Sequence, residues 1–270
     1  MSTGRTARAV FTALGLVAVT AAQARPIAAA SGRPDGAVPG RPGAAEVRYP
    51  ATGQSPGRDS TSLAALPLVV LRPARIRTDA FAILLSGDGG WANLDKQVAA
   101  YLTAHGIPVV GFNSLQYFWH RRTPEEIARD LGTIIRYYSA AWHLPGVALV
   151  GYSRGADVLP LMVSRLPDPL KAEVRLVALI GPELKASLEF HAQEWLGSPR
   201  QGYALLPEME KLQGLPLLCI HGQQERESLC PRLPAGLAET VLLPGGHHFG
   251  GDYRGLGRLI LARLDRSRLD

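Results

Sequence analysis

From about residue 66 to the C-terminus, short apolar runs alternate with segments whose apolar residues recur at helical spacing, and this pattern constrains the fold most. The runs end in turn-forming residues and are almost continuously apolar, which is typical of strands buried on both faces. They occupy residues 66–73, 81–90, 107–114, 146–153, 174–182, 215–222 and 239–246. Segments with helical periodicity occupy residues 93–106, 123–142, 154–166 and 252–264.

Repeated strand–helix units of this length predict an α/β fold, with a mostly parallel sheet and helices on both faces. One predicted helix carries a complete start signal: Thr123 as N-cap, Pro124 at the first helical position and Glu126 three residues past the cap. An irregular insertion, residues 183–213, interrupts the alternation, and whether it forms a lid stays open. We expect one domain over residues 63–270.

The N-terminal part of the chain differs in composition from this domain. Arg5 and Arg8 precede an uncharged apolar stretch, residues 9–22, which ends in a small-x-small sequence. The stretch is too short for a membrane span, so the pattern predicts a cleaved signal peptide over residues 1–24, with an uncleaved anchor as the alternative. Residues 25–62 are rich in Pro, Gly, Ala and Arg without periodicity, which predicts a disordered leader.

The charge distribution argues against a nucleic-acid partner. The formal charge of +6 falls to +4 once the two arginines of the predicted signal peptide are removed. The remaining basic residues are scattered rather than gathered in an aromatic-interleaved run, and a mildly basic exported protein suits an anionic envelope surface. His247, His248 and Asp252 lack an evident further strong ligand, so we expect no metal site and no cofactor.

Ser153 lies in Gly151-Tyr152-Ser153-Arg154-Gly155, a G-x-S-x-G sequence between a predicted strand and a predicted helix. This context is typical of a sharp turn that presents a nucleophilic serine, because glycines remove side chains where strand and helix crowd together. The helix N-terminus behind the serine favours developing negative charge. A close-packed turn with an incidental serine is the alternative.

The partners of such a serine follow in the order acid, then histidine. Glu225 lies just after the strand that ends at Gly222, with Glu227 as the alternative acid. His247 and His248 follow the last predicted strand. We expect His247 to be the base because it comes directly after a glycine pair, and His248 to pack alongside it or to bind substrate.

The oxyanion hole of such a site needs two backbone N–H groups. Arg154, the residue after the serine, supplies one, and Asp88 in the glycine-rich turn after residues 81–85 is expected to supply the other. Cys219 and Cys230 bracket the acid, and in an exported chain we expect them to form a disulfide that holds the acid loop, with two free thiols as the alternative.

Four ordered sequences, LLSGDGGWANLDK, GIPVVGFNSLQYFWHRRTPEE, LVGYSRGADVLP and PGGHHFGGDY, together resemble the VirJ/AcvB family of bacterial virulence proteins over about residues 66–265. The resemblance implies an α/β-hydrolase fold, a periplasmic location and a link to virulence in plant-infecting bacteria. It also implies hydrolysis of lysyl-phosphatidylglycerol and an association with type IV secretion. Longer family members carry an additional N-terminal domain, so this chain resembles the short form.

The resemblance implies that Ser153 attacks the lysyl ester of an aminoacylated phospholipid, and that an acidic recess receives the lysyl group. Asp157, one turn beyond the serine, is a candidate substrate contact, or it serves only the first turn of its helix. Tyr117 is a candidate contact for acyl chains at a membrane surface, or it packs under a loop. Two alternatives stay open: a non-catalytic adaptor for type IV secretion components or substrates, and a general carboxylesterase or peptidase.

Overall fold

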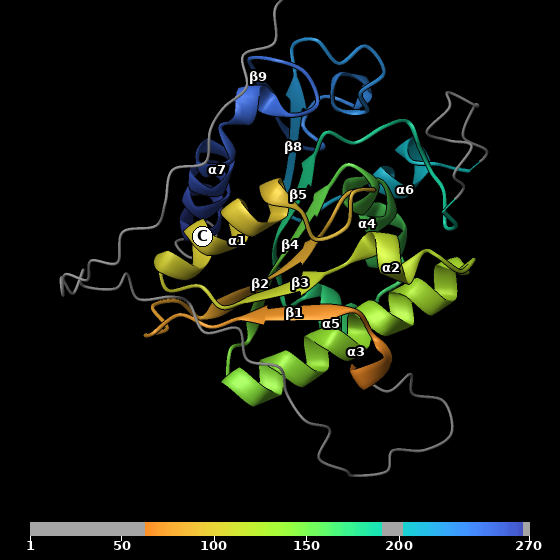
Figure 1. Cartoon of the computed structure of the whole chain (residues 1–270). Coiled ribbons are helices and arrows are strands. Elements are labelled where there is room, and N and C mark those ends of the chain that lie inside the picture. The colour runs from red at the N-terminus through yellow and green to blue at the C-terminus, as the bar shows by residue number, and fades with distance from the viewer. Residues whose placement is uncertain (1–62, 191–201, 267–270) are drawn as a thin grey trace, which may run out of the picture. The chain divides into compact units, whose positions relative to one another are not determined.

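The computed structural model describes residues 63–190 and 202–266. The predicted signal peptide and the whole of the predicted leader lie outside the described residues. A seven-stranded sheet forms the centre of this part of the chain, in the order β1-β3-β2-β4-β5-β8-β9 (Figure 1). Its strands are β1 (Leu68–Leu71), β2 (Ala80–Leu85), β3 (Val109–Phe112), β4 (Gly146–Tyr152), β5 (Val174–Ile180), β8 (Leu217–Gly222) and β9 (Glu239–Leu243).

All neighbouring strands are parallel except β1, which pairs antiparallel with β3 at one edge. The helices between them are α1 (Asn93–Ala104), α2 (Ser114–Tyr117), α3 (Pro124–Trp142), α4 (Arg154–Ser164), α5 (Asp168–Lys171), α6 (Leu206–Glu210) and α7 (Tyr253–Arg266). The mostly parallel sheet with helices on both faces, predicted from the alternating pattern, is confirmed. The sequence pattern does not predict the three short helices α2, α5 and α6.

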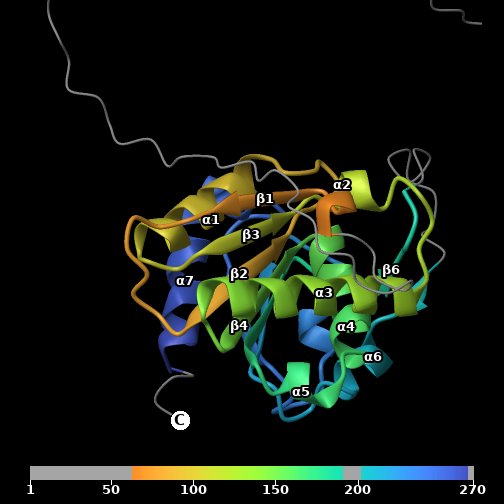
Figure 2. The same ribbon diagram turned by 90° about the horizontal axis from the view of Figure 1, so that it is seen from below.

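Strand side chains alternate between two apolar layers, one on each face of the sheet. In β2, Phe81, Ile83 and Leu85 pack into the layer formed with α3, α4, α5 and α6. Ala80, Ala82 and Leu84 of the same strand pack into the layer formed with α1 and α7. Figures 1 and 2 show α1 and α7 together on one side of the sheet and α3 and α4 on the other. Burial on both faces explains why the strands are continuously apolar.

The start of α3 confirms the helix signal in the sequence. The Thr123 side chain accepts a hydrogen bond from the Glu126 backbone N–H at 3.2 Å, and the Glu126 carboxylate accepts one from the Thr123 N–H at 2.8 Å. This reciprocal pair satisfies two N–H groups that have no partner within the helix. The helix then lies across the sheet and buries one apolar face against it.

The insertion at residues 183–213 contains a small hairpin and helix α6. Strands β6 (Lys185–Ala186) and β7 (Tyr203–Ala204) pair antiparallel apart from the main sheet. Residues 191–201 of the insertion fall outside the described part. Within residues 63–190 and 202–266, no helix has the length and apolarity to cross a bilayer.

Candidate active site

Ser153 occupies a strained turn between β4 and α4. Its backbone angles are φ 53° and ψ −120°, a combination that residues other than glycine rarely adopt. The two flanking glycines follow from close packing: a Cβ on Gly151 would lie 2.4 Å from the Gly155 carbonyl oxygen, and a Cβ on Gly155 would lie 2.2 Å from that of Leu85. The turn therefore has the shape that lifts a serine hydroxyl above a parallel sheet.

Glu225 and His247 come together at the carboxyl ends of β8 and β9. The Nδ1 atom of His247 lies 2.5 Å from Oε1 of Glu225, while Oε2 of Glu225 accepts a hydrogen bond from the Gly222 N–H at 2.6 Å. Gly181 lets this pair approach β5, because a Cβ there would lie 2.9 Å from the imidazole. Glu227 is exposed and has no comparable contact with the imidazole, so the structure favours Glu225 of the two acids.

The carboxylate of Glu225 is held in its ionised form. Burial alone raises its pKa, but the hydrogen bonds from His247 and from the Gly222 N–H outweigh burial and leave the pKa below its usual value. An ionised carboxylate accepts a hydrogen bond from His247 Nδ1–H, which keeps the proton on Nδ1 and makes Nε2 the basic atom of the ring.

Ser153 and His247 line the same cavity, which has a volume of about 390 Å³. The turn of residues 87–90 forms part of its wall, and a Cβ on Gly87 would lie 3.2 Å from the Cβ of Ser153. The turn is closed by a hydrogen bond from the Gly90 N–H to the Gly87 carbonyl at 3.1 Å. The glycine-rich turn and the serine turn thus lie against each other, and the oxyanion role of Asp88 stays a prediction.

Asp88 and Arg154, predicted as oxyanion donors through their backbone N–H groups, also form an ion pair through their side chains. The Arg154 guanidinium is buried and also donates to the carbonyl oxygens of Ser187 at 3.2 Å and Glu189 at 3.1 Å. This guanidinium ties the turn of residues 87–90 to α4 and to the insertion. The sequence offers one signal for this contact: Asp88 and Arg154 carry opposite charges, and their turns are predicted to adjoin at the oxyanion site.

Three carboxylates line the cavity, and none of its described lining residues is Lys or Arg. They belong to Asp88, Asp95 and Glu183. The sequence pattern predicts only a helix over residues 93–106 and does not single out Asp95. Burial raises the pKa of Asp95 from 3.8 to about 7, against the lowering effect of a hydrogen bond from the Ala92 N–H.

His248 lies beside the base and lines the cavity, as one of its two predicted roles requires. Its Nδ1 is 3.1 Å from the hydroxyl of Tyr152, which also lies 3.3 Å from the His247 carbonyl oxygen. Burial raises the pKa of Tyr152 above its usual range, so this hydroxyl stays neutral. Tyr152 therefore connects the serine turn to the histidine loop.

Two candidate substrate contacts are buried side chains with structural partners. Tyr117 lies in the apolar layer, packs edge-on against Phe112 and donates to Asp130 at 2.5 Å, which favours the packing role of its two predicted roles. Asp157 is also buried, and its Oδ1 accepts a hydrogen bond from the Glu183 N–H at 2.7 Å. It fixes the start of the insertion and is not among the residues that line the cavity.

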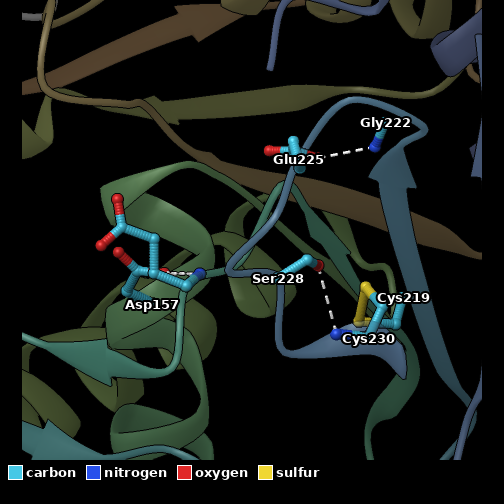
Figure 3. Close-up of a disulfide and its surroundings, with 7 residues drawn as sticks. Asp157, Cys219, Gly222, Glu225, Ser228 and Cys230 are labelled. Atoms are coloured by element: carbon cyan, nitrogen blue, oxygen red, sulfur yellow. Dashed lines mark hydrogen bonds between the residues drawn. A yellow bond between two sulfur atoms is a disulfide. The ribbon is translucent and has the colours of Figure 1, made fainter. Parts of the chain in front are cut away.

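Cys219 and Cys230 form the expected disulfide, with Cα atoms 5.5 Å apart. Figure 3 shows the bridge below the loop that carries Glu225, with the Ser228 hydroxyl accepting a hydrogen bond from the Cys230 N–H. The disulfide links β8 to the short 3₁₀ helix Cys230–Arg232 and so closes the loop that carries Glu225. This link restrains the loop at the carboxyl end of β8. In the described ranges, no three His, Cys, Asp or Glu side chains are grouped to hold a metal ion.

The family described as "Bacterial virulence protein (VirJ)" matches residues 79–268. The chain belongs to this family. The match spans both β2, which leads into the turn of residues 87–90, and the loop that carries the two histidines, so every part of the VirJ candidate site lies within it. A comparison with curated protein sequences found no match.

Solved structures show that this VirJ protein has the α/β-hydrolase fold. An esterase domain from Rhodothermus marinus aligns with a TM-score of 0.52 at 17% identity, covering 73% of this chain and 92% of that one. An alpha-beta serine hydrolase homologue from Coxiella burnetii gives 0.52 at 18%, covering 73% and 90%. The alpha/beta hydrolase GrgF from a Penicillium species gives 0.55 at 12%, covering 77% and 96%. At such identities the likeness establishes the fold.

Proposed function

We propose that this VirJ protein is a periplasmic serine hydrolase that cleaves the aminoacyl ester of lysyl-phosphatidylglycerol. Ser153 is the proposed nucleophile, His247 the base and Glu225 the group that orients the imidazole. The strained serine turn, the 2.5 Å contact between His247 and Glu225, and the shared cavity support a nucleophilic mechanism. Family membership and the fold support hydrolysis in general, and the family resemblance supports the lipid ester.

In the proposed reaction, His247 takes the hydroxyl proton as Ser153 attacks the lysyl carbonyl carbon. The backbone N–H groups of Arg154 and Asp88 are the proposed donors to the resulting oxyanion. The tetrahedral intermediate collapses, the ester bond breaks, and phosphatidylglycerol leaves with the proton from His247. Water then attacks the lysyl-serine ester with His247 again as base, which releases lysine and restores the serine.

The observation that carries the choice of substrate is the charge of the cavity. Its described lining contains three carboxylates and no Lys or Arg, and one of the three, Asp88, is paired with the buried Arg154 behind it. An acidic wall near the nucleophile favours a cationic acyl group and disfavours anionic ones such as succinyl. The lysyl group, with two ammonium groups, fits this wall better than an uncharged fatty acyl group does.

The disulfide supports an extracytoplasmic location, because such bonds persist in oxidising compartments. We propose that the predicted signal peptide exports the chain and is cleaved after residue 24. Cell fractionation with N-terminal sequencing of the mature protein tests this step. Recovery of the uncleaved chain in the cytoplasm would contradict it.

The central experiment compares the wild-type protein with Ser153→Ala on vesicles containing phosphatidylglycerol and radiolabelled lysyl-phosphatidylglycerol. We expect the variant to release lysine at least about a thousandfold more slowly, since it lacks the nucleophile. Circular dichroism and thermal unfolding show whether both proteins are folded.

Wild-type protein that releases no lysine would overturn the proposed substrate. Turnover of simple esters or peptides by the same protein would then favour a general esterase or peptidase. Full biological function of Ser153→Ala in cells would overturn catalysis altogether and favour an adaptor for secretion substrates.

A further inference from the structure

Asp95 is a buried carboxylate at the wall of the proposed active site, and one of its two oxygens has no hydrogen-bond partner among the described residues. The residue is 1% exposed and lines the cavity that contains Ser153. Its Oδ2 accepts a hydrogen bond from the Ala92 N–H at 3.1 Å. Among the described residues its Oδ1 has no hydrogen-bond partner, and the nearby charge of Lys96 lowers the pKa of the carboxyl only in part against burial.

Capping the helix does not account for this burial. Glu126 plays the same part at the start of α3, where its carboxylate accepts from the Thr123 N–H while remaining solvated. The hydrogen bond from Thr123 there leaves the pKa of Glu126 below its usual value. A buried carboxylate with one unpaired oxygen instead costs free energy, and such cost is typical of functional groups. An exposed carboxylate such as that of Glu126 caps a helix without the free-energy penalty of burial.

The surroundings of Asp95 suit a cation with an apolar stem. Tyr152 and Tyr253 line the same cavity, and the charge of Asp95 acts on the Tyr152 hydroxyl. Aromatic faces and a carboxylate together favour an alkylammonium group. No existing hydrogen bond at Oδ1 has to break when a cation approaches it.

We propose that Asp95 is the specificity-determining residue that receives the side-chain ammonium of the substrate's aminoacyl group. This inference rests on the proposed function and adds the residue that selects a cationic acyl chain. Asp88 is already paired with Arg154 beside the serine turn, so Asp95 is the lining carboxylate whose buried oxygen lacks a partner. Ion pairing to the arriving ammonium supplies that partner.

The test compares lysyl and norleucyl esters of glycerol, which differ only in the side-chain ammonium. We expect the wild-type protein to prefer the lysyl ester in kcat/KM. Asp95→Asn keeps an acceptor for the Ala92 N–H but lacks the charge, so we expect the preference to fall about 30-fold, from slower lysyl turnover alone. Asp168→Asn, which removes an exposed carboxylate from the first turn of α5, is the matched control and should keep the wild-type preference.

Separate outcomes distinguish this inference from the proposed function. If the wild-type protein hydrolyses neither ester, the proposed function fails. If it hydrolyses both equally well, or if Asp95→Asn keeps the lysyl preference, the function stands and the inference is overturned. Inhibition of the wild-type protein by hexylammonium but not by hexanol supports the inference independently of the variant's folding, and equal inhibition by both compounds contradicts it.

Discussion

Replacing Asp95 by Asn should change how the stability of the protein depends on pH. Burial raises the pKa of Asp95 in the folded protein to about 7, from 3.8 in a solvated chain. Between these two values the folded state holds a proton that the unfolded state releases. The contribution of Asp95 to stability is therefore fully present below the lower value and is lost as the pH rises towards 7.

The size of the effect follows from the two pKa values. The free energy of unfolding falls by about 1.3 kcal/mol from pH 5 to pH 6 and by about 1.0 kcal/mol from pH 6 to pH 7 through this single group. From pH 5 to pH 8 the loss is therefore about 2.7 kcal/mol, because titration of the folded state is nearly complete at pH 8. The side chain is 1% exposed, so solvent screening removes little of this effect.

Urea unfolding of the wild type and of Asp95→Asn at pH 5, 6, 7 and 8 measures the effect. The contributions of all other titrating groups cancel in the difference between the two proteins. We expect the stability of Asp95→Asn relative to the wild type to rise by about 2.7 kcal/mol over this range. Asp168→Asn, whose carboxylate is 97% exposed, should instead run parallel to the wild type. Parallel curves for Asp95→Asn and the wild type would refute the assignment of a buried carboxyl whose pKa is raised to about 7.

Three further perturbations test the site and its supports. Glu225→Gln should lower kcat about a thousandfold or more by misorienting the catalytic imidazole, whereas wild-type-like kinetics would exclude Glu225 as the acid. Gly155→Ala places a Cβ 2.2 Å from the Leu85 carbonyl oxygen and should cost about 1–3 kcal/mol in urea unfolding, and an unchanged midpoint would contradict the packing argument. Reducing the Cys219–Cys230 disulfide, whose cysteines are 11 residues apart, should cost about 2.8 kcal/mol by loop entropy, measured by unfolding with and without reductant, and identical curves would refute it.

The control for the acid is Glu227→Gln. This carboxylate lies two residues further along the same loop but is exposed, so we expect normal activity from the variant. Equal losses from both substitutions would indicate that the loop as a whole, rather than the contact between Glu225 and His247, supports turnover.

The sequence by itself determined the architecture and the position of the serine turn. Continuous apolar runs predict strands buried on both faces, and β2 packs alternate side chains into two layers as this pattern requires. The glycines around Ser153 were informative because backbone crowding of this kind excludes any side chain, and such local steric limits are visible in the order of residues alone.

Only the tertiary structure decided which polar side chains meet. The sequence favours Glu225 but leaves Glu227 open as the acid, and in the structure Glu225 contacts His247 while Glu227 is exposed. Asp157 stands one turn after Ser153, yet its carboxylate is occupied by a backbone N–H of the insertion.

Asp95 is the clearest case of a residue whose role depends on the fold. In sequence it is one acidic residue in the first turn of a helix, like Glu126 in α3. Burial and the missing partner of one oxygen appear only when α1 is packed beside the serine turn. The pKa of a carboxyl depends on the solvent and charges around it in three dimensions, and a linear sequence does not specify those surroundings.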